Sequence, residues 1–257
     1  MNALIDADIV AYRCAAASEN ENEDIAVYRT HDLMRRILHD TCATEYEAFL
    51  SGQNNFRKEV DPLYKAHRAL QPRPIYYEQC REALVTEWKA RVADGVEADD
   101  EIGLAATAYF EQAVPFVIAS IDKDLKQLPG KHFNFVTQEF AFVSPLDAIK
   151  TFYSQLLIGD RADNVIGVQG IGKVKSARLI DPLHEEIDMF TCVRALYHDD
   201  TRFYRNSQLL WILKKSLNPE EVLSHFHSLQ KLDVEVTSTS LPSSPETNDP
   251  GLEFTVQ

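Results

Sequence analysis

The stretch LIDADIVAYR, residues Leu4 to Arg13, decides the fold. An apolar run from Ala3 to Ile5 predicts a short buried strand, and apolar residues recur at helical spacing from Ile9 to Ala17. The acids Asp6 and Asp8 stand between these two patterns. A strand that passes within a few residues into a helix is typical of parallel α/β sheets, whose strands alternate with covering helices.

The rest of the first half repeats this alternation. Further strands are predicted at Tyr46 to Leu50, Val114 to Ala119 and Phe133 to Thr137, and further helices at about His31 to His39, Ile75 to Ala93 and Asp99 to Gln112. The alternation predicts an α/β fold with a central, mostly parallel sheet and flanking helices. We expect this unit to span residues 1–145.

Beyond Pro145 the pattern becomes helical. Apolar residues are spaced for helices at Leu146 to Leu157, Val174 to Ile180, Glu185 to Tyr197 and Ser207 to Leu213. We expect a helical region over residues 146–233. Residues 234–257 are rich in Ser, Thr, Pro and acid, and they are predicted to form a disordered tail because they can bury little apolar surface.

The composition limits the class of protein. With 257 residues, of which 45% are hydrophobic, the chain can bury a sizeable core. No apolar run reaches transmembrane length, and the N-terminus lacks the basic segment of a signal peptide. The four cysteines are far apart and form no CxxC pair, so neither a zinc site nor a disulfide framework is predicted. We expect a monomer in a reducing cytoplasm, with no membrane partner.

Carboxylates recur where the predicted strands end. Ligands of open α/β sheets bind in the crevice outside the carboxyl ends of the strands, so we expect these acids to converge. The strand-end acids are Asp6, Asp8, Glu97, Asp99, Asp100, Asp122 and Asp124. A further pair, Asp160 and Asp163, is spaced i and i+3 and is predicted to share one face of a helix. A helix cap or a loop position explains any single acid equally well, but it is a weaker explanation of four separate clusters.

Such a cluster of acids predicts bound cations. Carboxylates that lie close together raise each other's pKa unless positive charge compensates them. Oxygen ligands without His or Cys favour Mg²⁺ or Mn²⁺ over zinc. Two such ions about 4 Å apart could activate a water and stabilise the leaving oxygen in phosphodiester hydrolysis.

The basic residues are unevenly distributed. The net charge of −14 argues against a generic nucleic-acid binder, because phosphate contacts need Lys and Arg. The stretch FRKEVDPLYKAHRALQPRP, Phe56 to Pro74, departs from this balance, with Tyr64 among its cations. Its basic residues are Arg57, Lys58, Lys65, Arg68 and Arg73. Phosphate binding is one interpretation, and a solvated helical face whose cation stems cover apolar surface is the other.

A glycine-bearing turn is predicted to open a helix in GVQGIGKVKSARLI, Gly167 to Ile180. Glycines permit close backbone approach, and the free N–H groups at a helix N-terminus can meet a phosphate. Lys173, Lys175 and Arg178 lie at the start of this helix. Such turns also serve plain helix hairpins, but this one follows soon after Asp160.

Five stretches together resemble the bacteriophage and bacterial 5′ nucleases, a family that includes flap endonucleases and the nuclease domain of bacterial DNA polymerase I. The stretches are LIDADIVAYR, FRKEVDPLYKAHR, GVEADDEIGLAA, SIDKDLKQLPG and GDRADNVIGVQGIGKVKSA. They occur in the family's order and cover residues 1 to about 180. The resemblance implies a PIN-like sheet, a helical arch at about residues 56–93, and a helix-three-turn-helix at about residues 160–180 that grips duplex DNA.

The resemblance also implies roles for individual residues. Asp6 and Asp122 would be catalytic together with Lys65 and Arg68 of the arch, and K⁺ could bind at the helix-three-turn-helix. The implied ligands of two Mg²⁺ ions are Asp6, Asp8, Glu97, Asp99, Asp100, Asp122, Asp124, Asp160 and Asp163. The implied DNA contacts are Arg57, Lys58, Tyr64, Lys65, Arg68, Gly170, Gly172, Lys173, Lys175 and Ser176.

Two positions depart from the family pattern. Leu50 and Ser51 stand where the family has an aspartate after its second strand, so one metal ligand is missing or is supplied by Asp8. Val174 takes the place of the usual lysine after the glycines, with Lys175 next to it.

These observations leave three hypotheses of function. The leading one is a structure-specific 5′ nuclease that acts on DNA 5′ ends, flaps or nicks, or on RNA–DNA hybrids. It would serve replication and primer removal. If the protein is phage-encoded, it would act in the cytoplasm of a bacterial host. A catalytically weakened DNA-binding relative is the alternative that Ser51 favours. A PIN-like ribonuclease is the third, and the glycine hairpin after Asp163 counts against it.

Overall fold

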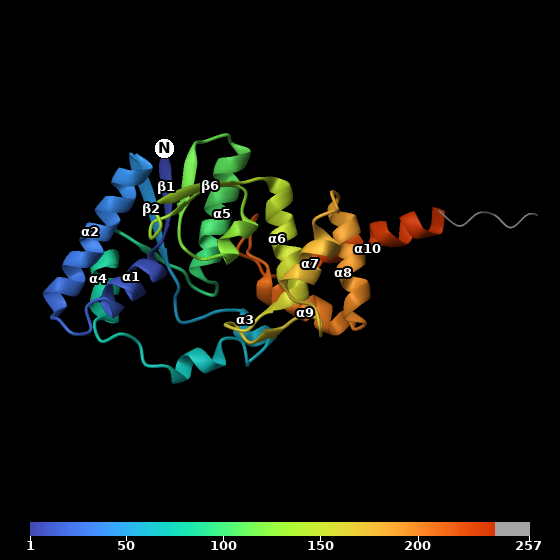
Figure 1. Cartoon of the computed structure of the whole chain (residues 1–257), viewed down its shortest axis with the longest axis horizontal. Helices are drawn as coiled ribbons and strands as arrows, with labels where there is room; N and C mark the ends of the chain where they lie inside the picture. Colours follow the sequence, from blue (N-terminus) through green and yellow to red (C-terminus); the bar gives the residue numbers. More distant parts are fainter. Residues whose placement is uncertain (240–257) are drawn as a thin grey trace, which may run out of the picture.

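The computed structural model describes residues 1–239, and Figure 1 shows a sheet half joined to a helical half. One six-stranded sheet forms the centre of the sheet half, in the order β3-β2-β1-β4-β5-β6. The strands are β1 (Asn2–Asp6), β2 (Glu45–Leu50), β3 (Arg91–Val92), β4 (Phe116–Ala119), β5 (Gly130–Asn134) and β6 (Glu139–Val143). Neighbouring strands are parallel except β5 and β6, so the predicted α/β fold is confirmed.

Helices cover both faces of the sheet (Figure 1). Ala3 and Ile5 of β1 pack with α1 (Ala7–Ala16), α2 (Glu23–Thr41) and α4 (Tyr77–Thr86). Leu4 points to the opposite face and packs with α5 (Ala98–Glu111). Burial on both faces explains why β1 is a continuous apolar run, as in other parallel sheets.

The helical half has its own aromatic core. It contains α6 (Pro145–Ile158), the hairpin strands β7 (Gly159–Asp160) and β8 (Val165–Ile166), and the helices α7 (Lys173–Ile180), α8 (Glu186–Tyr197), α9 (Asp200–Leu210) and α10 (Glu220–Thr239). Phe152, Phe190, Phe203 and Phe226 are fully buried at its centre. Ser144 caps α6 by accepting a hydrogen bond from the Asp147 N–H, which fixes where the helical half begins.

A segment of residues 56–76, here called the bridging segment, starts beside the helical half and runs back below the sheet half toward α4 (Figure 1). It contains the short helix α3 (Arg57–Val60) and the 3₁₀ turn η1 (Ala66–Leu70). The predicted arch of residues 56–93 is too long. Helix α4 packs on α1 and α2 instead, and β3 pairs with β2.

Several predicted elements differ from the structure for identifiable reasons. The strand predicted at Phe133 to Thr137 ends at Asn134, whose side chain accepts from the N–H groups of Val136 and Thr137 and forms a turn into β6. The helix predicted at Ser207 to Leu213 ends at Leu210. Beyond it, the Leu213 N–H donates to Asp100 in the sheet half rather than to a helical carbonyl.

The predicted tail begins too early in the chain. Helix α10 continues to Thr239, so residues 234–239 are helical, and residues 240–257 of the predicted disordered tail lie outside the described part. Within residues 1–239, no helix has the length and apolar character needed to cross a bilayer.

Candidate active site

Acids that follow neighbouring strands meet at the carboxyl edge of the sheet. Asp6 ends β1 and caps α1, because its Oδ1 accepts from the Ile9 N–H at 3.2 Å. Its Oδ2 accepts at 2.6 Å from the hydroxyl of Ser120, which directly follows β4. The Asp122 N–H donates to the same hydroxyl at 2.9 Å. Ser120 therefore ties together the acids that follow β1 and β4.

Burial raises the pKa of the central acids. The pKa of Asp6 rises to about 7, first because of burial and then because of Asp8 and Asp122 nearby. Burial also raises the pKa of Asp99 well above its usual value, and the charges of Asp6 and Asp122 add to this effect. Burial and then Asp122 raise the pKa of Asp124 to about 6. Like charges in a partly desolvated site need a cation before all of them can ionise.

Asp100 belongs to a different, fully buried ion pair. Arg57 donates to both of its carboxylate oxygens, at 2.6 and 2.8 Å. The N–H groups of Glu97 and Leu213 each donate to one of those oxygens, both at 3.0 Å. Each oxygen of Asp100 thus accepts two hydrogen bonds, which argues against Asp100 as a metal ligand; its predicted role as one stays a prediction. Arg57 also donates to main-chain carbonyls of the helical half and is 2% exposed, which argues against the direct DNA contact predicted for it.

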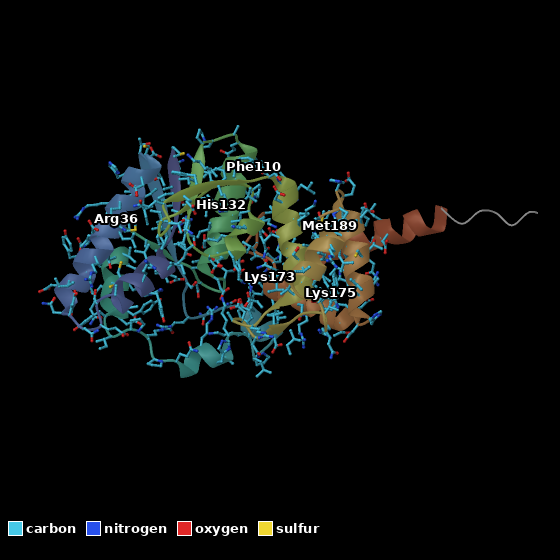
Figure 2. The ribbon with its side chains drawn as sticks, viewed as in Figure 1. Arg36, Phe110, His132, Lys173, Lys175 and Met189 are labelled. Carbon is cyan, nitrogen blue, oxygen red and sulfur yellow. The ribbon has the colours of Figure 1, made fainter. Side chains whose placement is uncertain are left out.

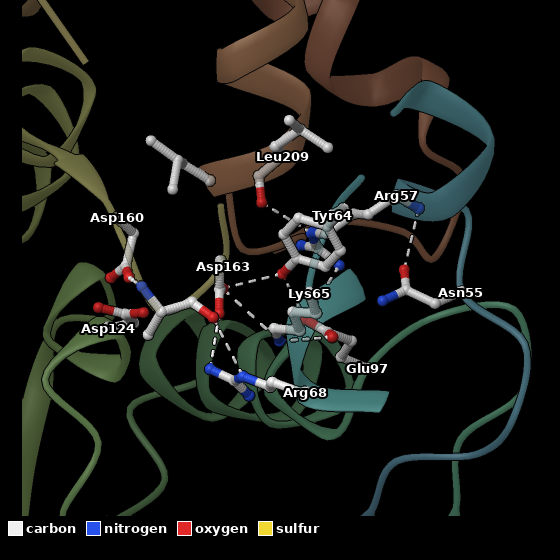
Figure 3. A network of polar contacts seen from close by, with 12 residues as sticks. Asn55, Arg57, Tyr64, Lys65, Arg68, Glu97, Asp124, Asp160, Asp163 and Leu209 are labelled. Atoms are coloured by element: carbon white, nitrogen blue, oxygen red, sulfur yellow. Dashed lines mark hydrogen bonds and ion pairs between the residues drawn. The ribbon is translucent and has the colours of Figure 1, made fainter. Parts of the chain in front are cut away.

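The bridging segment brings cations onto the acids (Figure 3). Lys65 Nζ lies 2.6 Å from Glu97 Oε1 and 3.6 Å from Asp163 Oδ2. Arg68 Nη2 lies 2.6 Å from Asp163 Oδ1. Burial alone would raise the pKa of Glu97, but Lys65 and then Arg57 lower it overall. The buried Tyr64 hydroxyl donates to Glu97 and Asp163, so Tyr64 supports these acids and is not an exposed DNA contact as predicted.

Asp160 and Asp163 lie on a hairpin turn and not on one helix face as predicted. Asp160 ends β7, and its Oδ1 accepts from the Ala162 N–H at 2.7 Å, which starts the turn. Lys123 Nζ lies 2.5 Å from the other oxygen of Asp160 and 3.2 Å from Asp124. Burial would raise the pKa of Asp160, but the Lys123 ammonium lowers it overall. Lys123 thus joins acids from the two halves of the molecule.

Asp8 lies beside Ser51, at the position where the family aspartate is absent. Asp8 Oδ2 accepts from the Ser51 N–H at 2.8 Å, and its Oδ1 lies 3.1 Å from Arg81 Nη1. Arg81 also donates to the Ser51 carbonyl at 2.5 Å. The Ser51 hydroxyl accepts from the Ala98 N–H and thereby supports the start of α5. Asp8 therefore places a carboxylate next to the end of β2.

The donor chemistry of this edge fits hard divalent cations. The available ligands are carboxylate oxygens, which are the preferred ligands of Mg²⁺. Within residues 1–239, no three acidic, His or Cys side chains stand in a geometry ready to hold a metal ion. Lys65, Arg68 and Lys123 lie among the carboxylates instead. Metal binding would therefore exchange ammonium and guanidinium contacts for metal–oxygen bonds.

The glycine-bearing loop before α7 is exposed. A Cβ added at Gly170 or Gly172 would have no neighbour within 4 Å, so another molecule can approach the backbone there. Lys173 and Lys175 are exposed in the first turn of α7 (Figure 2). Ser176 is 1% exposed, so its prediction as a direct DNA contact is wrong. Lys58 is exposed, as a phosphate contact requires.

Four residues of the site escaped the reasoning from sequence. They are Arg81, Ser120, Lys123 and Asn164. Ser120 and Lys123 stand next to the predicted acids in ASIDKD, so their place in the chain could have indicated them. Arg81 lies within a predicted helix, and nothing in the local sequence separates it from a solvated surface residue.

The open, mostly parallel sheet edged by carboxylates, with a basic segment bridging to a helical half, defines an α/β protein with a carboxylate site. The family model of the 5′-3′ exonuclease N-terminal resolvase-like domain matches residues 1–153. The chain belongs to this family and is a hydrolytic nuclease.

Two curated relatives agree with this assignment. The 5′-3′ exonuclease of Buchnera aphidicola subsp. Schizaphis graminum is 25% identical over 260 residues, covering 92% of this chain and 88% of the relative. The exodeoxyribonuclease of Enterobacteria phage T3 is 32% identical over 199 residues, covering 70% of this chain and 66% of the relative. These matches do not favour the alternative of a weakened DNA-binding relative.

A solved structure agrees with the fold. The T5 D15 protein, co-crystallised with metal ions, aligns with a TM-score of 0.67 over 93% of this chain and 99% of its own, at 17% identity. At that identity the likeness concerns the fold, and here it extends across both the sheet half and the helical half.

Proposed function

We propose that this protein is a structure-specific 5′ nuclease that hydrolyses DNA phosphodiesters at 5′ ends, flaps or nicks. The observation that supports this most directly is Lys65, which the bridging segment places within 4 Å of both Glu97 and Asp163. A cation at that place can meet the scissile phosphate as it reaches the carboxylates. The relatives named as exonucleases support cleavage from an end.

Divalent ions are part of this proposal, as Mg²⁺ or Mn²⁺ and two in number. The residues that would hold them are Asp6, Asp8, Glu97, Asp99, Asp122, Asp124, Asp160 and Asp163. When bound, the ions would supply an activated water and stabilise the leaving oxygen. The likeness to a protein solved with metal ions supports this assignment.

The chain's own residues would orient the substrate. Lys65 and Arg68 would leave Glu97 and Asp163 and donate to the non-bridging oxygens of the scissile phosphate, which stabilises negative charge in the transition state. Lys123 would be released from Asp160 in the same exchange.

The loop at Gly170 and Gly172, with Lys173 and Lys175, would hold the duplex backbone. Exposed N–H groups at the start of α7 and the two lysines suit phosphate oxygens. Lys58 would add a contact from the bridging segment. We also propose that K⁺ binds at the helix-three-turn-helix. The proposed substrates include RNA–DNA hybrids, and the proposed process is primer removal in replication. We further propose that the protein is a monomer and acts in the cytoplasm.

Cleavage of a 5′-labelled flap duplex tests the proposal. We expect cutting with Mg²⁺ or Mn²⁺, none with EDTA, and a loss of about a hundred-fold or more in Asp122→Asn, because metal catalysis supplies several kcal/mol. Asp188→Asn, an exposed acid on α8, is the matched control and should cut like the wild type. Equal cutting by the wild type and Asp122→Asn would refute the assignment of the site.

Ser51→Asp tests whether the absence of the family aspartate after β2 limits the rate of cleavage. We expect this variant to cut no faster than the wild type, because its new carboxylate would lie next to Asp8 and repel it. A large gain in rate would mean that the natural chain is a weakened enzyme at this position.

A further inference from the structure

The tip of the bridging segment is held over the acids by hydrogen bonds that involve the main chain. The Lys65 N–H donates to the Asp163 carbonyl at 3.1 Å. The side-chain amide of Asn164 donates to the Leu63 carbonyl at 3.1 Å. Arg68 Nε donates to the Ala162 carbonyl at 3.2 Å. All three bonds join the tip, residues 63–68, to the hairpin turn of residues 161–164.

Apolar burial in the tip is confined to one side chain. Leu63 is 62% exposed, and the Arg68 side chain is 51% exposed. Tyr64 is the large side chain of the tip that is buried. Beyond the burial of Tyr64 and the ion pairs of Lys65 and Arg68 with Asp163, these hydrogen bonds hold the tip, so the loss of one of them should weaken the docking.

The two facing turns each contain a residue with a left-handed backbone. Lys65 has φ 52° and Asn164 has φ 61°, so both adopt the left-handed conformation. Asparagine tolerates that conformation well, and glycine does so at no steric cost. Glycine would fit the backbone at position 164 equally well. The asparagine side chain adds a hydrogen bond from its amide to the carbonyl of Leu63, which a glycine could not make.

We infer that Asn164 is a positioning residue that docks the tip of the bridging segment on the hairpin turn and thereby sets Lys65 over the carboxylates. It acts through the main chain of Leu63 and not through charge. The bond persists when Lys65 and Arg68 exchange their acid partners for phosphate, since neither the Asn164 amide nor the Leu63 carbonyl takes part in that exchange. The consequence for catalysis rests on the proposed nuclease function, whereas the docking does not.

Hydrogen exchange in the metal-free full-length chain tests the docking alone. Asn164→Gly keeps the left-handed backbone and loses the amide, and Asn164→Asp keeps the size but cannot donate. We expect the amides of residues 63–68, with Lys65 the most informative, to exchange about five-fold faster in both variants, as for the loss of one hydrogen bond. Gln138→Gly is the matched control, because it also removes an exposed amide side chain at a left-handed position, φ 59°, in the turn before β6.

Single-turnover flap cleavage tests the consequence. We expect the rate of the chemical step to fall about five- to ten-fold in Asn164→Gly with duplex affinity unchanged, because the loop before α7 is untouched. Unchanged exchange in both Asn164 variants would overturn the inference. Faster exchange with an unchanged rate would overturn the positioning of Lys65. A wild type that does not cut would refute the proposed function, and the exchange result would still decide the docking.

Discussion

Arg57 and Lys65 lie on the same basic stretch, yet their surroundings give them opposite roles. Arg57 is 2% exposed and pairs with Asp100, so its charge is neutralised inside the protein. Lys65 remains partly exposed between Glu97 and Asp163, which also have other cations beside them. A desolvated pair with complete hydrogen bonding stays closed, whereas a pair whose lysine side chain is 21% exposed can exchange one partner for a phosphate.

Removal of the Arg57 charge should therefore affect stability. We expect Arg57→Met to lower the free energy of unfolding by about 3–5 kcal/mol, because it leaves the Asp100 carboxylate buried without a counterion. Denaturant unfolding measures this. Lys58→Met, the exposed neighbour, is the matched control and should change stability by about 0.5 kcal/mol or less. Similar losses in both variants would show that the buried pair contributes little.

Helix α7 is the element that most directly presents positive charge to a duplex. Its first turn has two exposed lysines on either side of Val174, which is 68% exposed. The departure from the family pattern at Val174 therefore leaves cations on both sides of that position. The exposed glycines before α7 leave room for a phosphate at the N–H groups of its first turn.

The salt dependence of DNA binding tests this role of α7. We expect the double variant Lys173→Ala and Lys175→Ala to bind a flap duplex more weakly and to reduce the slope of log K against log salt by about two, since each phosphate contact contributes about 0.9. Fluorescence anisotropy in EDTA over a salt series measures both quantities. Val174→Ala should leave the slope unchanged, and an unchanged slope in the double variant would move the duplex contact elsewhere.

At the scale of the whole molecule, the two halves share one set of acids. Asp6, Asp99 and Asp122 come from the sheet half, whereas Asp160 and Asp163 come from the hairpin that starts the helical half. Lys123 on Asp160, and Lys65 on Asp163, already join the halves across this edge. A divalent ion bound there would replace those contacts with stronger ones.

Metal binding should therefore stabilise the fold, and more so as the pH rises. The folded pKa of Asp6, about 7, lies above its ordinary value of 3.8. Between these pH values the metal-free folded state therefore binds more protons than the unfolded state. The contribution of Asp6 to the stability of the metal-free fold thus falls as pH rises. Mg²⁺ requires ionised acids, so we expect its increase in Tm over EDTA to be small at about pH 5 and several degrees at about pH 8. Asp122→Asn should lose most of that increase, and an equal increase at both pH values would contradict the prediction.

The sequence indicated the sheet and its acidic edge with good accuracy. Apolar runs such as Ala3 to Ile5 are local features, and parallel strands must end on the same side, so the acids that follow them had to gather there. The helix predicted at Ile75 to Ala93 ends at Thr86, and Arg91 and Val92 pair with β2 instead. The helix predicted at Ser207 to Leu213 ends at Leu210, beyond which the chain bonds to Asp100 of the sheet half. Local periodicity does not record such contacts.

The sequence by itself determined the fold class, the edge of the sheet at which the acids lie and the glycine loop, because each follows from residue patterns that are local in the chain. Only the tertiary structure decided which charges are available. Arg57 is closed off by the carbonyls of Leu209 and Trp211, which return to it from the far end of the chain. Asn164 reaches Leu63 in the same long-range way. Burial and pairing depend on which distant segments meet, and that is a property of the folded chain as a whole.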